Sequence, residues 1–169
     1  MKNKTILLLL SLIARIPLAV SRRLGDALGV MLRWTNSRPY RVTKINLPLC
    51  YPDLSPAQID DLCKQRMSQL GQAFFETPRL WRQSSQWLSS KIVGIDGQEF
   101  LQTALDNKRG TILLIPHQGN WEVLGLWISK QTIMTSLYEP PKMVELESWV
   151  KSSRERSGAT LVPTNVRGE

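Results

Sequence analysis

The sequence predicts an α/β protein in which an N-terminal membrane-associated helix is followed by a largely parallel sheet covered by helices. The first observation is a short unbroken apolar run at residues 111 to 115, opened by Gly110 and closed by Pro116, which is typical of a strand buried on both faces. The second is that segments of strand and helix character alternate around this run, which predicts parallel strands joined by helices. With 169 residues, of which 42% are apolar, the chain is long enough for one ordinary core.

Residues 1–35 are predicted to form a membrane-anchoring helix. The net charge of the chain is +8, and all of the excess positive charge lies in residues 1–45, interleaved with aliphatic side chains. This pattern favours an anionic membrane surface over nucleic acid. The apolar run of residues 5–20 is interrupted by Arg15 and Pro17 and is shorter than the roughly 20 residues of a comfortable span. We therefore expect a helix at the bilayer interface, with a secretory signal or a solvated amphipathic helix as alternatives.

Residues 36–169 contain the segments from which the sheet and its helices are predicted. Residues 41–55 hold two prolines and are expected to turn the chain, and Ser55 is a plausible N-cap for the helix that follows. The predicted helices are 56–75, 98–107, 120–130 and a segment that contains Arg154; the predicted strands are 91–95, 111–115, 131–138 and 159–163.

A histidine follows the central apolar run directly. His117 is the single histidine of the chain, and Glu122 lies five positions further on, where the strand gives way to a helix. In a regular helix residues five apart point in different directions, but a bend at Gly119 and Asn120 would bring both side chains to one side of the turn. A carboxylate can then hold one imidazole nitrogen while the other takes a proton from a hydroxyl group.

Such a dyad suits acyl transfer, because an acceptor alcohol can attack a thioester without any enzyme nucleophile. The chain has no G-x-S-x-G sequence of the kind that serine hydrolases carry. The alternative, a structural histidine at the end of a strand, is equally compatible with the spacing. Two widely spaced cysteines and one histidine make a zinc site unfavourable, and no metal or other cofactor is expected.

The segment HQGNWE resembles the His-x4-Asp/Glu box of the lysophospholipid acyltransferase superfamily, and its Glu form resembles the bacterial lipid A biosynthesis (lauroyl/myristoyl) acyltransferases. Three further stretches agree in order: residues 41–55, the aromatic and proline motif at residues 138–142, and the helix around Arg154. The second stretch departs from the family at Glu139, where arginine is common. The resemblance implies an α/β acyltransferase fold with His117 as general base and Glu122 as its orienting partner.

The resemblance also implies substrates, partners and a location. Arg154, Lys142 and Asn120 become candidate substrate-binding residues. A solvated helix face explains Arg154 equally simply, and a solvated turn is the default explanation of Lys142. The expected donor is an acyl carrier protein thioester, and the expected acceptor is a hydroxyl of a lipid A precursor at the cytoplasmic face of the inner membrane. A phospholipid, an aminolipid or a mannosylated lipid is an alternative acceptor.

The resemblance covers almost the whole chain but only the N-terminal part of the family's fold. We therefore expect residues 36–169 to be the N-terminal portion of an incomplete acyltransferase domain, with residues 164–168 beginning a further helix. An inactive truncated product that only binds membranes is the alternative that involves no catalysis.

Overall fold

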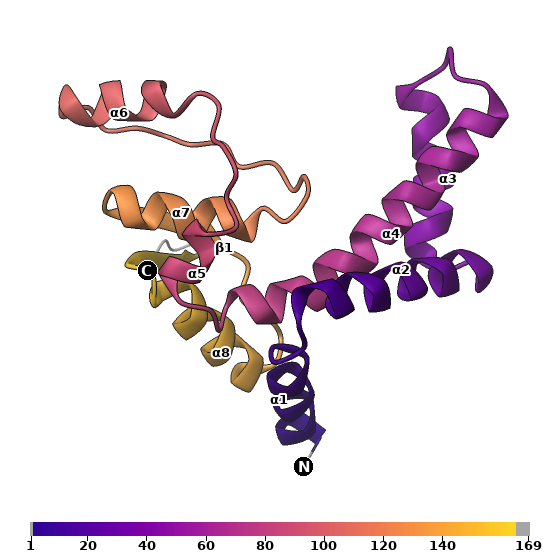
Figure 1. Ribbon diagram of the computed structural model, residues 1–169, viewed down its shortest axis with the longest axis horizontal. Coiled ribbons are helices and arrows are strands. Elements are labelled where there is room, and N and C mark those ends of the chain that lie inside the picture. The colour runs from indigo at the N-terminus through magenta and orange to yellow at the C-terminus, as the bar shows by residue number, and fades with distance from the viewer. Residues whose placement is uncertain (1, 165–169) are drawn as a thin grey trace. The chain divides into compact units, whose positions relative to one another are not determined.

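The computed structural model describes residues 2–164, and the side chains of that range except those of residues 2–4, 85 and 145. Figure 1 shows a chain dominated by helices with one small sheet. Leu9–Arg79 forms one compact unit, and the chain from Leu80 onward, together with the first residues of the chain, forms the other. The helix expected to begin at residues 164–168 falls almost entirely outside the described residues.

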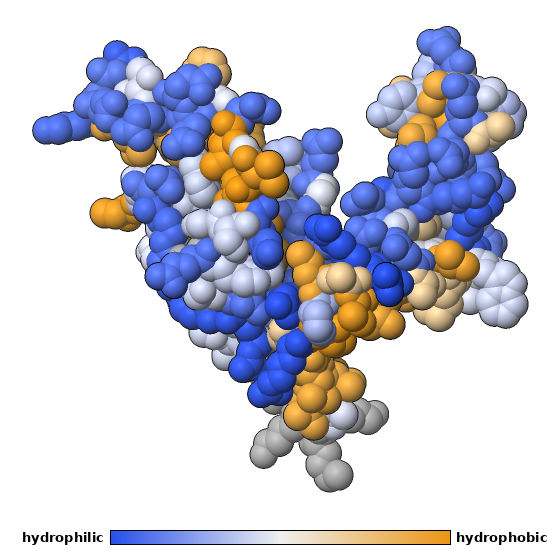
Figure 2. Space-filling view, viewed as in Figure 1, coloured by the Kyte–Doolittle hydropathy of each residue, from blue (hydrophilic) through white to orange (hydrophobic). Residues whose placement is uncertain are grey.

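The predicted N-terminal helix is two helices, α1 (Lys2–Ile13) and α2 (Leu18–Trp34). Pro17 precedes α2, and its ring disfavours helical geometry at Ile16. The chain therefore turns there, with hydrogen bonds between residues three apart, as in a 3₁₀ turn. No single described helix is long and apolar enough to cross a bilayer; Thr5–Ile13 and Leu18–Trp34 meet that requirement only as a pair bent by 118°. Figure 2 shows apolar side chains gathered over α1, where Leu8, Leu9 and Leu12 are exposed.

The segment expected to turn between residues 41 and 55 is mostly a helix, so that prediction was wrong. The helix α3 runs from Arg38 to Cys50, with a proline in its first turn and Pro48 in its last. Proline is tolerated at the start of a helix, and Pro48, which has no N–H to donate, lies in the last turn of α3 with one backbone bond missing. The turn itself is confined to residues 51–55.

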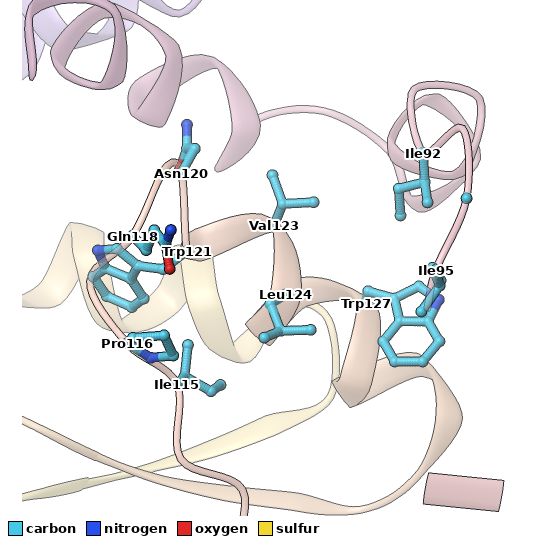
Figure 3. Close-up of a pocket in the computed structure, with 11 residues that line it drawn as sticks. Ile92, Ile95, Ile115, Pro116, Gln118, Asn120, Trp121, Val123, Leu124 and Trp127 are labelled. Carbon is cyan, nitrogen blue, oxygen red and sulfur yellow. The ribbon is translucent and has the colours of Figure 1, made fainter. Parts of the chain in front are cut away.

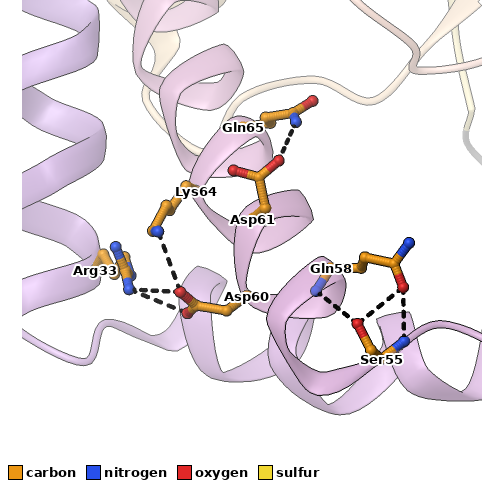
Figure 4. A network of polar contacts seen from close by, with 7 residues as sticks. All are labelled: Arg33, Ser55, Gln58, Asp60, Asp61, Lys64 and Gln65. Atoms are coloured by element: carbon orange, nitrogen blue, oxygen red, sulfur yellow. Dashed lines mark hydrogen bonds and ion pairs between the residues drawn. The ribbon is translucent and has the colours of Figure 1, made fainter.

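The helix predicted from residue 56 is confirmed and longer than expected, since α4 spans Pro56–Leu80. Ser55 caps it as predicted: the backbone amide of Gln58 donates to the Ser55 hydroxyl, and the Gln58 side chain accepts from the Ser55 amide at 2.9 Å. Figure 4 shows this reciprocal pair beside the ion pairs that join Asp60 to Arg33 and Lys64.

Helices α2 and α4 pack so closely that their backbones touch. A Cβ atom on Gly29 would lie 2.7 Å from the carbonyl oxygen of Met67, and one on Gly71 would overlap the carbonyl oxygen of Gly25. Polar pairs continue this contact along both helices: Arg22 with Glu76 at 2.8 Å, Asp26 with Gln72 at 2.7 Å, and Arg33 with Asp60 at 3.0 Å. Because the numbers rise along α2 as they fall along α4, the two helices run antiparallel.

The second unit contains a single two-stranded parallel sheet among the described residues. Strand β1 (Met134–Tyr138) pairs with β2 (Ala159–Pro163) from Met134 opposite Ala159 to Tyr138 opposite Pro163, and α8 (Val144–Glu155) connects the strands. The remaining helices are α5 (Ser85–Ser89), α6 (Gln98–Asp106) and α7 (Glu122–Gln131). The βαβ connection confirms the predicted parallel pairing, and a mostly helical chain with this small sheet is compatible with the predicted α/β class. The helices predicted at 98–107 and 120–130 and the strand predicted at 159–163 are also present.

Two other predicted strands are absent from the described residues. Neither 91–95 nor the central run 111–115 forms a strand, and Ile112 and Leu114 are about nine-tenths exposed. An apolar, β-branched run becomes a strand only when another strand offers its backbone groups, and the described residues provide no such neighbour for it. The core of this unit lies elsewhere, around Leu80, Leu88 and Leu126.

Candidate active site

Glu122 is the first residue of α7 and, among the residues that the structure describes, the one charged residue that is buried, with 5% of its surface exposed. A carboxylate is favoured at a helix N-terminus because the free backbone amides there carry partial positive charge. Its oxygen Oε2 accepts hydrogen bonds from Trp81 Nε1 at 2.9 Å and from Arg154 Nε at 3.1 Å. The other oxygen, Oε1, accepts from Arg154 Nη2, so the carboxylate and the guanidinium form a bidentate pair.

Arg154 reaches Glu122 from α8 and lies against two indole rings. Its guanidinium carbon is 5.0 Å from the ring centre of Trp121 and 5.5 Å from that of Trp81. The Trp81 ring in turn meets Trp149 edge to face at 5.1 Å. Planar guanidinium groups are weakly hydrated and stack on aromatic faces, which explains how this charge is accommodated with little water around it.

The position of α8 is fixed at both ends. Tyr138, buried at the end of β1, donates a hydrogen bond from its hydroxyl to Glu147 Oε1 at 3.0 Å, and its burial raises the pKa of the phenol. At the other end, Arg156 donates to the carbonyl oxygens of Arg82 and Gln83. These contacts hold the helix that carries Arg154.

His117 lies in the irregular segment before α7 and is exposed. Its ring meets the Trp121 ring edge to face at 5.0 Å, and Gly119 adopts a left-handed backbone (φ +57°) between the two. The bend expected at Gly119 is therefore present. His117 and the Arg154 guanidinium each contact the Trp121 ring, so this ring connects the histidine to the pair formed by Arg154 and Glu122. Among the described contacts there is no hydrogen bond between His117 and Glu122; the Glu122 carboxylate accepts from Arg154 and Trp81.

An apolar pocket of about 400 Å³ opens beside this cluster. Two stretches line it, residues 92–95 and residues 115–127, and Figure 3 shows side chains from both turned toward the same space. Asn120 and Gln118 contribute its polar side chains at the end where the His117 loop lies, whereas the opposite end holds Ile92, Ile95 and Trp127.

The other predicted site residues are placed differently. Asn120 is half-buried on the pocket wall, beside the cluster. Lys142 is exposed in the turn between β1 and α8, and no described ion pair joins it to Glu122. Within residues 2–164 no three His, Cys, Asp or Glu side chains gather in a way that could hold a metal ion.

Trp81 and Trp121 are site residues whose roles the sequence did not reveal. Both are among six tryptophans, and an indole in a core, in a pocket or at a membrane looks the same in sequence. The position of Trp121 inside HQGNWE is the one local signal that could have distinguished it. Nothing local marks Trp81, which lies 41 residues before its hydrogen-bond partner Glu122.

The irregular loop with an exposed histidine, the buried carboxylate at the start of α7 and the βαβ unit that supplies the arginine define a candidate acyltransferase site. Over residues 5–167 the chain matches the family described as bacterial lipid A biosynthesis acyltransferase, and it belongs to that family. The family membership predicted from HQGNWE is thereby confirmed.

Curated relatives are moderately similar. The chain is 27% identical over 159 residues to the lipid A biosynthesis palmitoleoyltransferase of Escherichia coli, and the matched region covers 91% of this chain and 50% of that protein. It is 24% identical over 153 residues to the lipid A biosynthesis lauroyltransferase of Escherichia coli, covering 86% and 48%. It is also 30% identical over 110 residues to the phosphatidylinositol mannoside acyltransferase of Mycolicibacterium smegmatis, covering 64% and 36%. The chain thus spans half or less of the length of these relatives.

Proposed function

We propose that the protein takes part in O-acyl transfer from an acyl carrier protein thioester to a hydroxyl of a lipid A precursor. The observation that carries this proposal is the exposed His117 imidazole next to a buried carboxylate and an apolar pocket, in a chain of the lipid A acyltransferase family. An exposed imidazole is available to an acceptor, and the pocket offers room for apolar substrate.

His117 acts as general base in this proposal. It removes the proton from the acceptor hydroxyl as the oxygen attacks the thioester carbonyl, and the tetrahedral intermediate then collapses with release of the thiol. The proton held by the imidazole passes to the departing sulfur, so no cofactor is consumed. Backbone amide donors or Arg154 stabilise the negative oxygen of the intermediate.

Glu122 is proposed as the partner that orients the imidazole. In the structure its oxygens accept from Arg154 and Trp81, while His117 contacts Trp121. Catalytic hydrogen bonds are often long or misaligned before substrate binds. In this proposal the exposed His117 side chain turns toward Glu122 when substrate binds, and Arg154 holds the Glu122 carboxylate in place.

The remaining proposed roles concern the substrates. Asn120, on the pocket wall, and Lys142, exposed before α8, are candidates for contacts with the acceptor or its phosphate groups. The basic and apolar N-terminal region would hold the protein at the cytoplasmic face of the inner membrane and attract acyl carrier protein, which is acidic. The boundary proposed at residues 35 and 36 separates this anchor from the catalytic part.

Acyl transfer measured directly tests the proposal. Membranes that contain the 169-residue chain, or a chimera that continues it with the remainder of a relative, are supplied with radiolabelled acyl carrier protein and a lipid A precursor. His117→Ala is expected to lower transfer by about a hundredfold or more, because general-base catalysis contributes on that order. Gln102→Ala, which changes an exposed side chain on α6, is the control and is expected to leave transfer unchanged.

The acceptor is tested in the same assay with a phosphatidylinositol mannoside and a lysophospholipid, since one relative is named for a mannoside. Transfer to the mannoside in preference to the lipid A precursor would replace the acceptor but keep the roles of His117 and Glu122. Equal transfer by the unaltered protein and His117→Ala would contradict the catalytic assignment.

A further inference from the structure

Trp81 contacts both helices that supply the charged pair of the candidate site. Its half-buried indole donates a hydrogen bond from Nε1 to Glu122 Oε2 at 2.9 Å, at the start of α7. The same ring meets two side chains of α8, the Trp149 ring edge to face at 5.1 Å and the Arg154 guanidinium at 5.5 Å. These ring contacts hold the indole, which has a single N–H to donate, so that the N–H points at the carboxylate.

The two oxygens of the Glu122 carboxylate are not equivalent. Oε2 accepts from Trp81 Nε1 and from Arg154 Nε, whereas among the described contacts Oε1 accepts one hydrogen bond, from Arg154 Nη2. Each oxygen of an ionised carboxylate has room for about two donors. Oε2 is therefore fully occupied, and Oε1 keeps one position for a further donor.

Trp81 is the cause of this difference. An arginine fork supplies one donor to each carboxylate oxygen, so the pair with Arg154 alone would leave a free position on both. The indole N–H fills the position on Oε2. Trp81 is not among the described residues that line the apolar pocket, so it acts on the carboxylate rather than on a molecule in that pocket.

We propose that Trp81 is a positioning residue, whose N–H occupies Glu122 Oε2 so that the His117 imidazole binds to Oε1. This assignment rests on the proposed general-base role of His117, and it names the oxygen at which the two side chains meet. With one open acceptor the imidazole has one way to approach, and its other nitrogen is then directed toward the acceptor hydroxyl. Without the indole N–H the imidazole has two competing positions.

Replacement of the indole N–H alone tests this role. Benzothienylalanine, which carries sulfur in place of the N–H, is introduced at position 81 of the 169-residue chain, or of the chimera described above, by nonsense suppression. We expect kcat for acyl transfer to fall about tenfold with the KM of the acyl thioester unchanged, because a hydrogen bond to a charged group contributes on that order. A role in packing alone would change the urea midpoint and leave kcat as it is.

The same replacement at Trp149 is the matched control. The Trp149 ring packs against Trp81, but its indole is not a donor to Glu122 among the described contacts. Benzothienylalanine there keeps the ring contact, so kcat and KM are expected to equal those of the unaltered protein. An equal loss of kcat at both positions would refute a specific role for the Trp81 N–H.

Indole NMR tests the contact without requiring transfer. The Trp81 Nε1–H resonance of the isotope-labelled, detergent-solubilised protein is assigned by its loss in Trp81→Phe. We expect this proton to exchange slowly with solvent and its resonance to move upfield in Glu122→Gln, in which the acceptor is no longer a carboxylate. A rapidly exchanging proton whose resonance Glu122→Gln leaves in place would overturn the proposal.

The two experiments separate the role of Trp81 from the proposed function. A kcat that benzothienylalanine at position 81 leaves unchanged, in a protein whose transfer is lost in His117→Ala, would refute the role of Trp81 and leave the proposed acyl transfer standing. Absence of transfer in every form of the protein would refute the proposed function and this role with it, whatever the indole resonance shows.

Discussion

Each of the two units of the molecule is stabilised internally by a different kind of contact. In Leu9–Arg79 the helices α2 and α4 meet backbone to backbone through glycines, and their polar pairs lie at the edges of that contact. In the unit from Leu80 onward a bidentate ion pair between Glu122 and Arg154 joins α7 to α8 among indole rings. One contact depends on the absence of side chains, and the other depends on two particular side chains being present.

This difference has a functional consequence. A glycine contact is closely packed and offers no side-chain chemistry. A buried charge pair costs desolvation and adds little net stability compared with apolar packing, so its presence next to His117 favours a role in positioning. The charged cluster lies in the unit that carries the family's sequence box, whereas the glycine contact lies in the other.

The largest expected effect comes from breaking the ion pair. Arg154→Ala leaves the buried Glu122 carboxylate without a counter-charge and is expected to cost about 3 to 5 kcal/mol in the free energy of unfolding. Glu122→Ala leaves the Arg154 guanidinium unpaired, but this group is partly exposed, so the expected cost is smaller. The double variant should cost clearly less than the sum of the two. Urea unfolding of the detergent-solubilised protein measures all three.

Arg156→Ala is the control for these variants, because it removes an exposed arginine at the end of the same helix that donates only to carbonyl oxygens. Its expected cost is about 1 kcal/mol. Additive losses in the double variant would mean that the two side chains do not depend on each other, and the comparison between the units would fail.

The next effect concerns the glycine contact. A methyl group on Gly71 would overlap the Gly25 carbonyl oxygen, which belongs to the backbone and cannot swing aside, so Gly71→Ala is expected to force α2 and α4 apart at a cost of about 3 kcal/mol. Gly94→Ala is the control, since a Cβ atom there meets nothing within 4 Å. Equal urea midpoints for the two variants would show that the backbone contact does not hold this unit.

The sequence could predict those elements that depend on local signals. The helix after Ser55 begins at a reciprocal cap that is visible in the residue types, and β2 is a short β-branched segment that follows Gly158. The role of the glycines of α2 could not be predicted from the sequence. A glycine lowers helix propensity, and only the contact with the partner helix α4 explains why glycine is present. Pro48 likewise predicted a turn, although its place in the last turn of α3 is compatible with a helix.

For the candidate site, the sequence could name residues but could not show which of them would touch. Spacing and the resemblance identified His117, Glu122 and Arg154, and the structure gathers them around Trp121. Which of them would touch depended on residues far away in the sequence, above all Trp81 and the βαβ unit that positions Arg154. The buried strand predicted before His117 failed for a similar reason, because a strand is defined by its neighbour and not by its own composition.

Cysteine reactivity reports on the stability of the helical unit, because Cys50 and Cys63 both lie within Leu9–Arg79. Cys63 is buried in α4 and burial raises the pKa of its thiol, whereas Cys50 is exposed at the end of α3. Since the thiolate is the reactive form, N-ethylmaleimide is expected to modify Cys50 first. Gly71→Ala should expose Cys63 to the reagent, and Arg154→Ala should not. Loss of protection in Arg154→Ala would mean that the two units unfold together.

The smallest expected effect is the response of the helical unit to acid. Hydrogen bonds from Ser68 and Gln72 lower the pKa of Asp26 below its ordinary value. A carboxyl group whose pKa is lower in the folded protein adds stability above its unfolded pKa, about 3.9, and loses it as the pH falls through the folded value. Urea midpoints should therefore fall less steeply below about pH 4 in Asp26→Asn than in the unaltered protein.

Ser68→Ala separates this carboxyl group from the others that titrate in acid. It removes the strongest donor to Asp26, so it should flatten the acid dependence part of the way toward that of Asp26→Asn while leaving the charge of the chain unchanged. The same slope in all three proteins would show that the polar contacts at the edges of α2 and α4 do not respond to pH. The glycine contact alone would then account for the cohesion of this unit, and the contrast with the charge-dependent site around Glu122 would be sharper.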